Sequence, residues 1–227
     1  MMTGVVPGVA DAITVVAATA TEARPVRRRL RDVPGVRVEI GGIRASRWRP
    51  SAGATVLSCG LAGGLDESVP TGSLVIPDVV GVDGGIRYAC DDELVARLRA
   101  AARECGLAAH PGPLLSVGHV VSGVERRLWA ARGYAAADME SGVLARLAGR
   151  FAVVRVVLDT PQREISPAWH RPARAIARPR LWGQALWMAR FAPGQCDVAA
   201  RVVAEALSSP PSAQARGTSE PPARPAG

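Results

Sequence analysis

The chain has 227 residues, a length that suits one α/β domain with a short extension. A hydrophobic content of 48% excludes a globally disordered chain, and no uncharged apolar run reaches the roughly 20 residues of a membrane-spanning helix. The formal net charge of +8 comes from arginine alone, because the sequence contains no lysine. The triplet Arg27-Arg28-Arg29 lacks interleaved aromatic residues, so we expect no nucleic-acid partner.

The cysteines and the N-terminal sequence indicate in which cellular compartment the protein resides. The four cysteines form no Cys-x-x-Cys pair and show no disulfide spacing, and the chain has three histidines. This composition predicts no metal site and favours a cytoplasmic protein. The N-terminus is apolar but lacks the positively charged start of a signal peptide.

The first half of the chain is rich in strands and glycine turns. Gly41-Gly42 stands between two apolar runs, which predicts a hairpin. Pro77 predicts an edge or a bend in the strand that contains it. In chain order, the predicted segments are a loose lead at 1–12, a strand at 13–18, a helix at 21–31, a hairpin of the runs 36–40 and 43–48, and strands at 54–59 and 74–82.

The second half alternates helices with strands. Asp91 or Asp92 can cap the first of these helices. In chain order, the predicted segments are a helix at 91–105, a strand at 114–117, a helix at 124–132, a strand at 134–137, a helix at 142–147, a strand at 151–158, and helices at 181–191 and 197–207. We therefore predict an α/β fold: a single domain at 13–207, with a mixed central β-sheet flanked by helices, and a disordered C-terminal tail at 208–227.

Three of the predicted strands end in carboxylates. Glu22 follows the first strand, Asp138 and Glu140 follow a later one, and Asp159 ends the last. Ligand crevices of α/β proteins form at the carboxyl edge of the sheet, where such side chains gather. The glycine-rich run 60–65 follows another buried strand, and its backbone can approach a ligand closely. Together these features predict a binding site.

Each carboxylate also has a structural interpretation. Glu22 can be an acid in the first turn of a helix, where the helix dipole favours it. Asp159 can cap a turn before Pro161, and Asp138 is more readily interpreted as an N-cap than as a catalytic group. Glu140 is harder to explain this way, because it lies two residues beyond Asp138 at the start of a predicted helix.

Four motifs, in this order, resemble the nucleoside phosphorylase/nucleosidase superfamily. They lie at 17–22, 58–65, 138–141 and 157–159. Within the superfamily, the chain is most similar to the hopanoid-associated branch, the adenosylhopane nucleosidase or phosphorylase. That finer resemblance rests on the run Gly-Leu-Ala-Gly-Gly-Leu-Asp at 60–66, on Arg87-Tyr88-Ala89 before a helix that begins at Asp91, on the spelling Asp138-Met139-Glu140-Ser141, and on the run 159–167.

The resemblance implies a nucleoside phosphorylase-like fold and cleavage of the bond between ribose and adenine. Asp159 matches the acid that protonates the leaving purine, Glu22 the carboxylate that activates water, and Glu140 the group that holds the ribose hydroxyls. The remaining implied contacts are Met139 beneath the sugar, Gly60, Ala62, Gly63 and Gly64 in the nucleophile pocket, and Val120 and Val121 against the base.

Three departures from the family pattern bear on the reaction. Leu61 stands where relatives commonly have Ser or Thr, and Ser58 stands where the phosphorylases carry an arginine for phosphate. A phosphate dianion needs donors and positive charge, so these two changes favour water as nucleophile. Arg24 and the amides of the glycine run favour phosphate instead, because they could supply positive charge and hydrogen-bond donors. Leu158 replaces the usual Ser before the acid, which affects the orientation of Asp159.

The resulting hypothesis is a purine nucleosidase (N-glycosyl hydrolase) that releases adenine from a 5′-modified adenine nucleoside, with adenosylhopane of hopanoid biosynthesis as the first candidate. The alternatives are phosphorolysis of the same bond, a methylthioadenosine/adenosylhomocysteine-type or futalosine-type nucleosidase, and a non-catalytic nucleoside-binding protein. We expect no cofactor, with phosphate as co-substrate if the enzyme is a phosphorylase.

The family pattern and the C-terminal composition predict two kinds of partner. Family members commonly form dimers, so a homodimer is expected. The segment 169–191 combines tryptophan with arginine, as surfaces at a membrane interface do. Trp182 and Trp187 therefore predict a peripheral contact with the inner face of the membrane, and a lipid-linked nucleoside would suit it. The alternative is an ordinary helix pair that covers the sheet.

Overall fold

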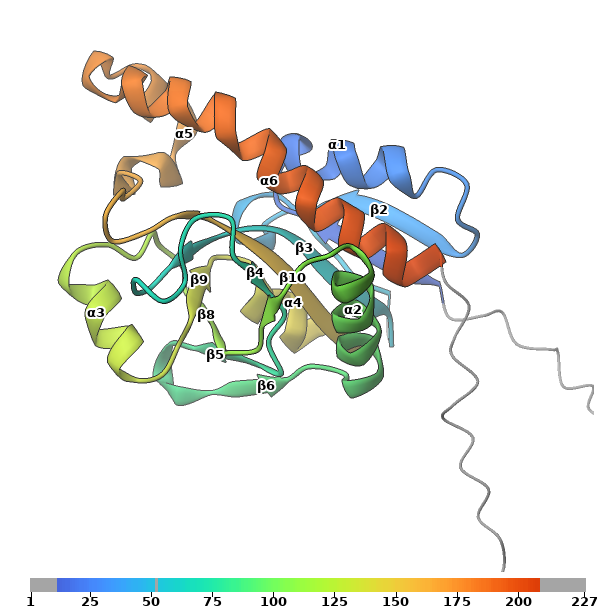
Figure 1. Cartoon of the computed structure of the whole chain (residues 1–227). Coiled ribbons are helices and arrows are strands. Elements are labelled where there is room, and N and C mark those ends of the chain that lie inside the picture. Colours follow the sequence, from blue (N-terminus) through green and yellow to red (C-terminus); the bar gives the residue numbers. More distant parts are fainter. Residues whose placement is uncertain (1–11, 52, 209–227) are drawn as a thin grey trace, which may run out of the picture.

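The computed structural model describes residues 12–51 and 53–208 of the chain (Figure 1). Nearly all of the predicted lead, and the predicted tail beyond residue 208, lie outside these residues. Within them, a ten-stranded mixed sheet is flanked by helices in a single domain, which confirms the predicted fold class. No helix in the described part of the chain is long and apolar enough to cross a membrane.

Two long parallel strands, β3 (Thr55–Gly64) and β10 (Arg150–Asp159), form the centre of the sheet. On the other side of β3 lies β1 (Ile13–Ala17), followed by β2 (Val36–Ile40), both parallel to it. Every residue of β10 from Phe151 to Asp159 is buried. Such continuous burial is expected where helices cover both faces of a strand.

The glycine run of β3 connects the two halves of the sheet. Gly63 and Gly64 pair with β9 in the antiparallel direction, and the pairs β10–β4 and β5–β6 are also antiparallel, so the sheet is mixed. The remaining strands extend it as β6-β5-β8-β9 on one side and β4-β7 beyond β10. Their bounds are β4 (Leu74–Val75), β5 (Val79–Val82), β6 (Arg87–Ala89), β7 (Ala109–His110), β8 (Leu114–Ser116) and β9 (Ala136–Asp138).

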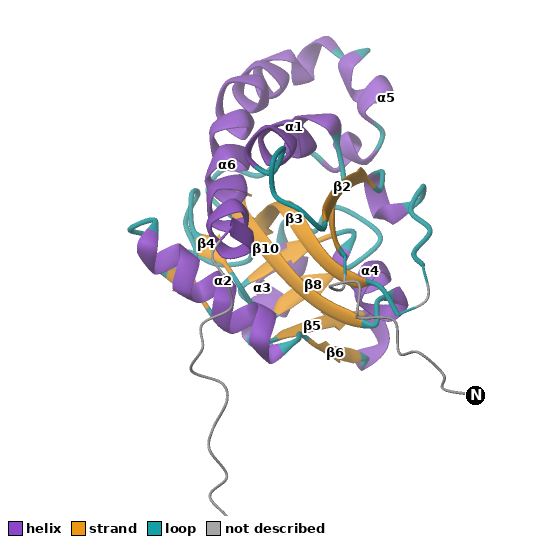
Figure 2. Cartoon of the chain, turned by 90° about the vertical axis from the view of Figure 1, so that its right-hand side faces the viewer, coloured by secondary structure: helices purple, strands orange, loops and turns teal. Residues whose placement is uncertain are grey.

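Helices α1, α2 and α6 pack together, and α6 lies on β3 and β10 (Figures 1 and 2). Helix α4 packs on the sheet through β3, β5, β8 and β10. The α-helices are α1 (Ala20–Arg29), α2 (Asp92–Glu104), α3 (Val124–Ala131), α4 (Ser141–Leu147), α5 (Pro172–Ile176) and α6 (Trp182–Ser208). The short 3-10 turns are η1 (Ile43–Ala45), η2 (Asp83–Gly85), η3 (Pro167–His170) and η4 (Pro179–Leu181).

Two predictions about local structure are wrong. The expected hairpin around Gly41-Gly42 is absent, because β2 pairs with β1 in parallel and the chain then turns into η1 with Gly42 at a φ of +75°. The two expected C-terminal helices are one helix, α6, which continues through Pro193 and Gly194. A proline inside a helix costs about 3 kcal/mol. We attribute the continuity to the residues beyond Pro193, which bury an apolar face.

Candidate active site

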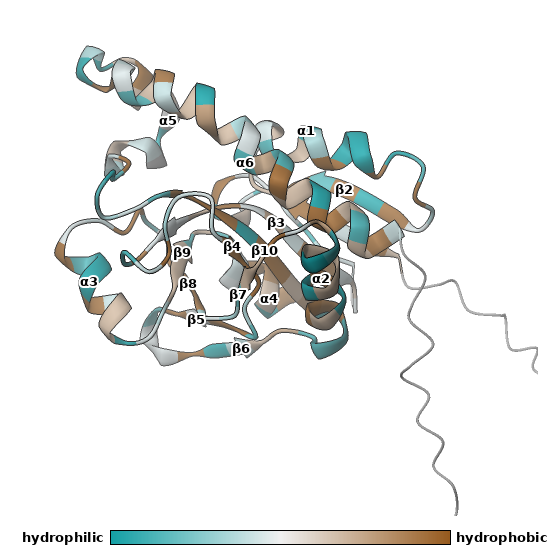
Figure 3. Ribbon diagram, in the orientation of Figure 1, coloured by the Kyte–Doolittle hydropathy of each residue, from teal (hydrophilic) through white to brown (hydrophobic). Residues whose placement is uncertain are grey.

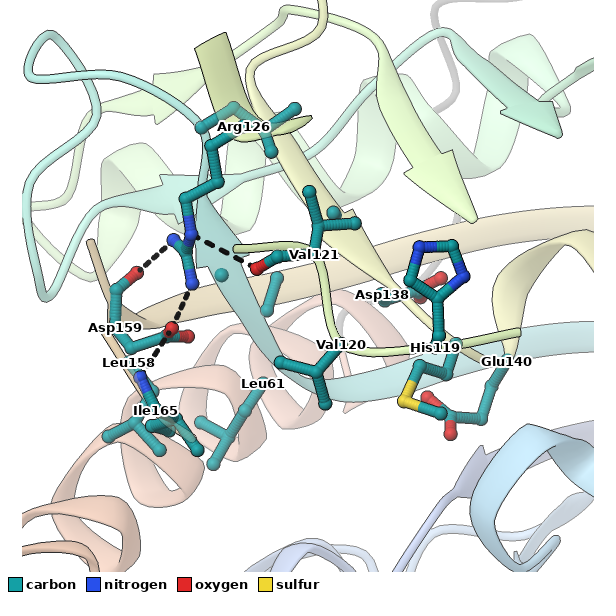
Figure 4. A pocket seen from close by; sticks show the side chains of 15 residues that line it. Leu61, His119, Val120, Val121, Arg126, Asp138, Glu140, Leu158, Asp159 and Ile165 are labelled. Carbon is teal, nitrogen blue, oxygen red and sulfur yellow. Dashed lines mark hydrogen bonds and ion pairs between the residues drawn. The ribbon is translucent and has the colours of Figure 1, made fainter. Parts of the chain in front are cut away.

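One pocket lies where β3, β9 and β10 come together, and its volume is about 170 Å³ (Figure 4). Asp159 and Glu140 lie toward opposite ends of it, with Leu61 and Val120 between them. The lining is mostly apolar with a few charged groups, as is usual for sites that bind small molecules. The lining residues are Leu61, Ala62, Gly63, Leu65, His119, Val120, Val121, Arg126, Ala137, Asp138, Met139, Glu140, Leu158, Asp159 and Ile165.

At one end of the pocket, Asp159 forms a buried ion pair with Arg126. The second contact of the carboxylate is the backbone N–H of Ile165, which donates to Oδ2 at 3.2 Å. Burial raises the pKa of Asp159 above its ordinary value, while the Arg126 guanidinium and the Ile165 amide act in the opposite direction. The side chain lies against Gly63, where a Cβ would come within 2.9 Å of Oδ1.

Arg126 comes from α3 and is held by backbone groups of the pocket wall. It is 1% exposed and donates to the carbonyls of Val121 and Gly64. Glu164 lies 3.3 Å from its Nε and also accepts the N–H of Gly123 at the start of α3. The sequence analysis did not identify Arg126 as a site residue. The adjacent Arg127 is exposed, and nothing local in the sequence shows which arginine points inward.

At the opposite end, Glu140 accepts a hydrogen bond from the backbone N–H of Arg44 (2.9 Å). Arg44 and Ala45 have φ values of 60° and 50°, a left-handed conformation that is uncommon outside glycine. Burial raises the pKa of Glu140 to about 7, and the nearby Asp138 carboxylate adds to the rise. This carboxyl group is therefore only partly ionised at neutral pH.

Asp138 belongs to a buried network centred on Arg155. The guanidinium contacts Oδ2 of Asp138 through Nε (2.9 Å) and Nη2 (2.7 Å). It also donates to the hydroxyls of Ser58 (2.7 Å) and Ser141 (3.1 Å). Asp138 in turn accepts the N–H of Ser141, but the N-cap position of α4, predicted for Asp138, is occupied by Glu140. Arg155 therefore neutralises charge behind the pocket.

The sequence does contain a signal for Arg155. It is the one charged residue within the otherwise apolar run 151–158. A charged side chain inside a buried strand needs a partner of opposite charge, because an unpaired buried charge is very costly. The sequence signal predicts such a partner, but only the fold identifies it as Asp138.

Glu22 lies next to the backbone of β3 rather than in the lining of the pocket. It forms a capping box with Thr19, whose N–H and hydroxyl both donate to Oε2 at 2.8 Å. Its other oxygen accepts the N–H of Leu61 at 3.0 Å. A Cβ at Gly60 would lie 2.3 Å from Oε1, so the glycine is what allows the approach. Glu22 therefore lies in the first turn of α1, as its structural interpretation predicted, and also contacts the glycine run.

The other predicted site residues divide into two groups. Ala62, Gly63, Val120, Val121 and Met139 line the pocket together with Glu140 and Asp159. Gly60 and Gly64 lie in β3 outside that lining, and Gly64 offers its carbonyl to Arg126.

Two further side chains bear on the chemistry of the pocket. Arg24 is exposed and lies over a surface groove of α1 with Arg27, Arg28 and Arg31, away from the pocket. His119 lines the pocket, and its Nε2 contacts Glu125 Oε1 at 2.8 Å. Arg24 therefore does not contribute positive charge to the pocket in this structure.

The sequence model of the Phosphorylase superfamily matches residues 52–171, which include β3, the β9–α4 junction and β10. The chain belongs to the phosphorylase superfamily. No curated protein matches the chain significantly.

Solved structures of nucleosidases have the same fold at low sequence identity. A futalosine hydrolase mutant of Helicobacter pylori has a TM-score of 0.65 and 13% identity, over 86% of this chain and 98% of that one. The 5′-methylthioadenosine/S-adenosylhomocysteine nucleosidase of Neisseria meningitidis, in complex with methylthio-immucillin-A, has a TM-score of 0.64 and 17% identity, over 87% and 98%. These similarities establish the fold of this superfamily member.

Proposed function

We propose that this member of the superfamily cleaves the N-glycosidic bond of a 5′-modified adenine nucleoside and releases adenine by acid-assisted hydrolysis. The observation that carries the proposal is the placement of Asp159 and Glu140 toward opposite ends of one mostly apolar pocket (Figure 4). A nucleoside has a base at one end and ribose hydroxyls at the other. Such a ligand can therefore meet one carboxyl group at each end.

In this proposal Asp159 is the acid at the base end. Breaking the bond to ribose requires the leaving purine to accept a proton, and burial of Asp159 favours the protonated carboxyl that can donate it. Arg126 opposes this by stabilising the carboxylate. The pair would hold the acid in position when the site is empty. Val120 and Val121 would pack against the base.

At the ribose end, Glu140 would accept hydrogen bonds from the sugar hydroxyls, with Met139 beneath the ring. A carboxylate is the stronger acceptor, so binding would improve above the pKa of about 7. Glu22 would position the attacking water next to the glycine run. Its support is the contact with the N–H of Leu61, which Gly60 allows because it has no side chain where the carboxylate lies.

The charges around the glycine run support water over phosphate as nucleophile. Arg24, which the sequence offered as a source of positive charge for phosphate, does not line the pocket. Arg155 is close to Ser58, the position where phosphorylases carry an arginine, but it already donates to Asp138, Ser58, Ser141 and the carbonyl of Val154. A phosphate dianion would find few unpaired donors among these groups.

Adenosylhopane is the first substrate candidate, and it rests on the sequence motifs of the hopanoid-associated branch. The enzyme would act in hopanoid biosynthesis as a cytoplasmic homodimer without a cofactor. A methylthioadenosine/adenosylhomocysteine-type or futalosine-type activity is the second candidate, because the similar structures are those of a futalosine hydrolase and a 5′-methylthioadenosine/S-adenosylhomocysteine nucleosidase. Phosphorolysis and non-catalytic nucleoside binding are the remaining alternatives.

The test is chromatographic measurement of adenine released from adenosylhopane, methylthioadenosine and adenosylhomocysteine, and of hypoxanthine released from futalosine. We expect release without phosphate, and an Asp159→Asn variant about 100-fold to 10,000-fold slower. Asp83→Asn, in an exposed turn, is the matched control. Release that requires phosphate contradicts hydrolysis, and no release from any substrate contradicts the enzyme. Because the variant removes the buried negative charge that faces Arg126, circular dichroism must show that it is folded in the assay.

A further inference from the structure

The segment from η3 into the first half of α6 carries positive charge without any negative charge. We refer to residues 167–191 as the arm. Its five arginines are all exposed, and it contains no Asp or Glu. They are Arg171, Arg174, Arg178, Arg180 and Arg190. The arm is thus a compact cationic surface.

The arm projects from the body of the protein (Figure 1). Helix α6 packs on α1, α2 and the sheet through its later residues, and Cys196, Ala199, Ala200, Val202 and Val203 are buried. Before Cys196, Trp187 is the one buried side chain of this helix. The first half of α6 and the whole of α5 therefore extend beyond the packed part of the helix.

Hydrophobic and hydrophilic residues are mixed along the end of the arm, in α5 and the start of α6 (Figure 3). Ile176, Trp182 and Leu186 are 58%, 60% and 73% exposed. The indole N–H of Trp182 donates to the carbonyl of Ile176 at 2.9 Å, which joins α5 to the start of α6. Trp182, Leu186 and Arg190 follow at intervals of four residues, so they share one face of the helix.

The structure corrects one half of the expected tryptophan pair. Trp187 is 9% exposed and is covered by the guanidinium of Arg163, 4.4 Å from the ring centroid. It also lies beside Phe191, with ring centroids 5.8 Å apart. Trp187 therefore fixes the arm to the body, and only Trp182 is available to an external partner.

We propose that the arm docks this protein onto membranes rich in anionic phospholipid, with Trp182, Leu186 and Ile176 entering the headgroup region. Tryptophan and leucine suit that depth, and arginines around them are attracted by anionic headgroups. A second copy of the chain is a poorer occupant, because two arms in contact would place five arginines against five. The pocket residue Ile165 lies immediately before the arm, so docking would hold the pocket close to the bilayer.

The first experiment measures co-sedimentation of the full chain with phosphatidylcholine vesicles, with and without phosphatidylglycerol. We expect binding to the anionic vesicles only, weaker at high salt. Trp182→Ser with Leu186→Ser should lower the bound fraction about tenfold. The control pair Val124→Ser with Leu128→Ser, on the exposed face of α3, should leave it unchanged. No binding by the wild type, or equal loss in both pairs, overturns the proposal.

The second experiment distinguishes binding through the arm from binding through the overall net charge of +8. The triple variant Arg174→Gln, Arg178→Gln, Arg180→Gln should weaken vesicle binding far more than Arg24→Gln, Arg27→Gln, Arg31→Gln, which removes the same charge from α1 and the turn that follows it. Equal effects would show that binding reflects net charge alone. If the Trp182/Leu186 pair instead changes a dimer to a monomer in light scattering, the surface is a contact between copies and the proposal falls. Neither readout depends on catalysis.

Discussion

At the level of single residues, the site is a set of buried carboxylates whose partners come from distant elements. Asp159 is paired with Arg126 of α3, and Asp138 of β9 is paired with Arg155 of β10, on the far side of β3. Glu140 has a backbone amide as its hydrogen-bond partner. Removing one partner of a buried pair typically costs about 3–5 kcal/mol. Glu140 has the weakest compensation, and burial raises its pKa to about 7.

This raised pKa predicts a pH-dependent stability. The folded protein holds the proton of Glu140 up to about pH 7, whereas the unfolded chain releases it near 4.5. Between these values the folded state binds more protons, so its stability falls as pH rises. Glu140→Gln should therefore be more stable than the wild type at pH 8 by roughly 2–3 kcal/mol, and similar to it at pH 4.5.

Urea denaturation at the two pH values measures this difference. The exposed Glu67→Gln is the control and should show no pH-dependent gain. A constant difference between Glu140→Gln and the wild type at both pH values would show that burial does not raise the pKa of Glu140.

At the level of elements, the start of α1 serves both folding and the site. The Thr19 capping box begins the helix, and its Glu22 carboxylate also binds the N–H of Leu61 in β3. The helix therefore holds the predicted water-activating group in one place. It can do so only because Gly60 presents no side chain to that carboxylate.

A pair of glycine substitutions tests this arrangement. In Gly60→Ala the new Cβ would lie 2.3 Å from Glu22 Oε1, so the carboxylate must move. We expect kcat to fall and the free energy of unfolding to drop by about 1–3 kcal/mol, as in an overpacked core. In Gly194→Ala the Cβ meets no atom within 4 Å, and the helix should gain up to about 1 kcal/mol.

Thermal unfolding and steady-state kinetics read out both variants. Gly194→Ala should raise Tm by about 2–4 °C without changing kcat. Full activity in Gly60→Ala would mean that the position of Glu22 is not critical for the reaction.

At the level of the whole molecule, α6 packs against elements from the beginning, the middle and the end of the described chain. Its later residues pack against α1 near the N-terminus, α2 in the middle, and the central strands. Ala199, Ala200, Val202 and Val203 are 0% exposed. This helix, which ends at Ser208, is the last element in the described part of the chain.

Two truncations test whether the fold ends with this helix. Removing residues 209–227 should leave Tm within about 1 °C and the activity unchanged, because the buried face of α6 remains. Ending the chain after residue 195 removes that face and should abolish cooperative unfolding in calorimetry. A large loss of stability in the first truncation would show that the fold extends beyond residue 208, contrary to the predicted domain boundary.

The sequence alone determined the features that depend on residues close together in the chain, such as helices, strands and helix caps. Apolar runs located the long strands β3 and β10 and most helices, although the short strands β6 and β7 were not predicted and the run 74–82 divides into β4 and β5. Asp91 was one of two predicted caps of α2 and accepts the N–H of Leu94, and the strand-ending carboxylates marked the pocket that Asp159 and Glu140 line. Tertiary structure decided the rest. Arg126 meets Asp159 across 33 residues and Arg155 meets Ser58 across 97, so no local pattern shows these contacts. Likewise, β2 pairs with β1 instead of forming a hairpin, and burial carries α6 through Pro193, because packing outweighs local turn and helix preferences.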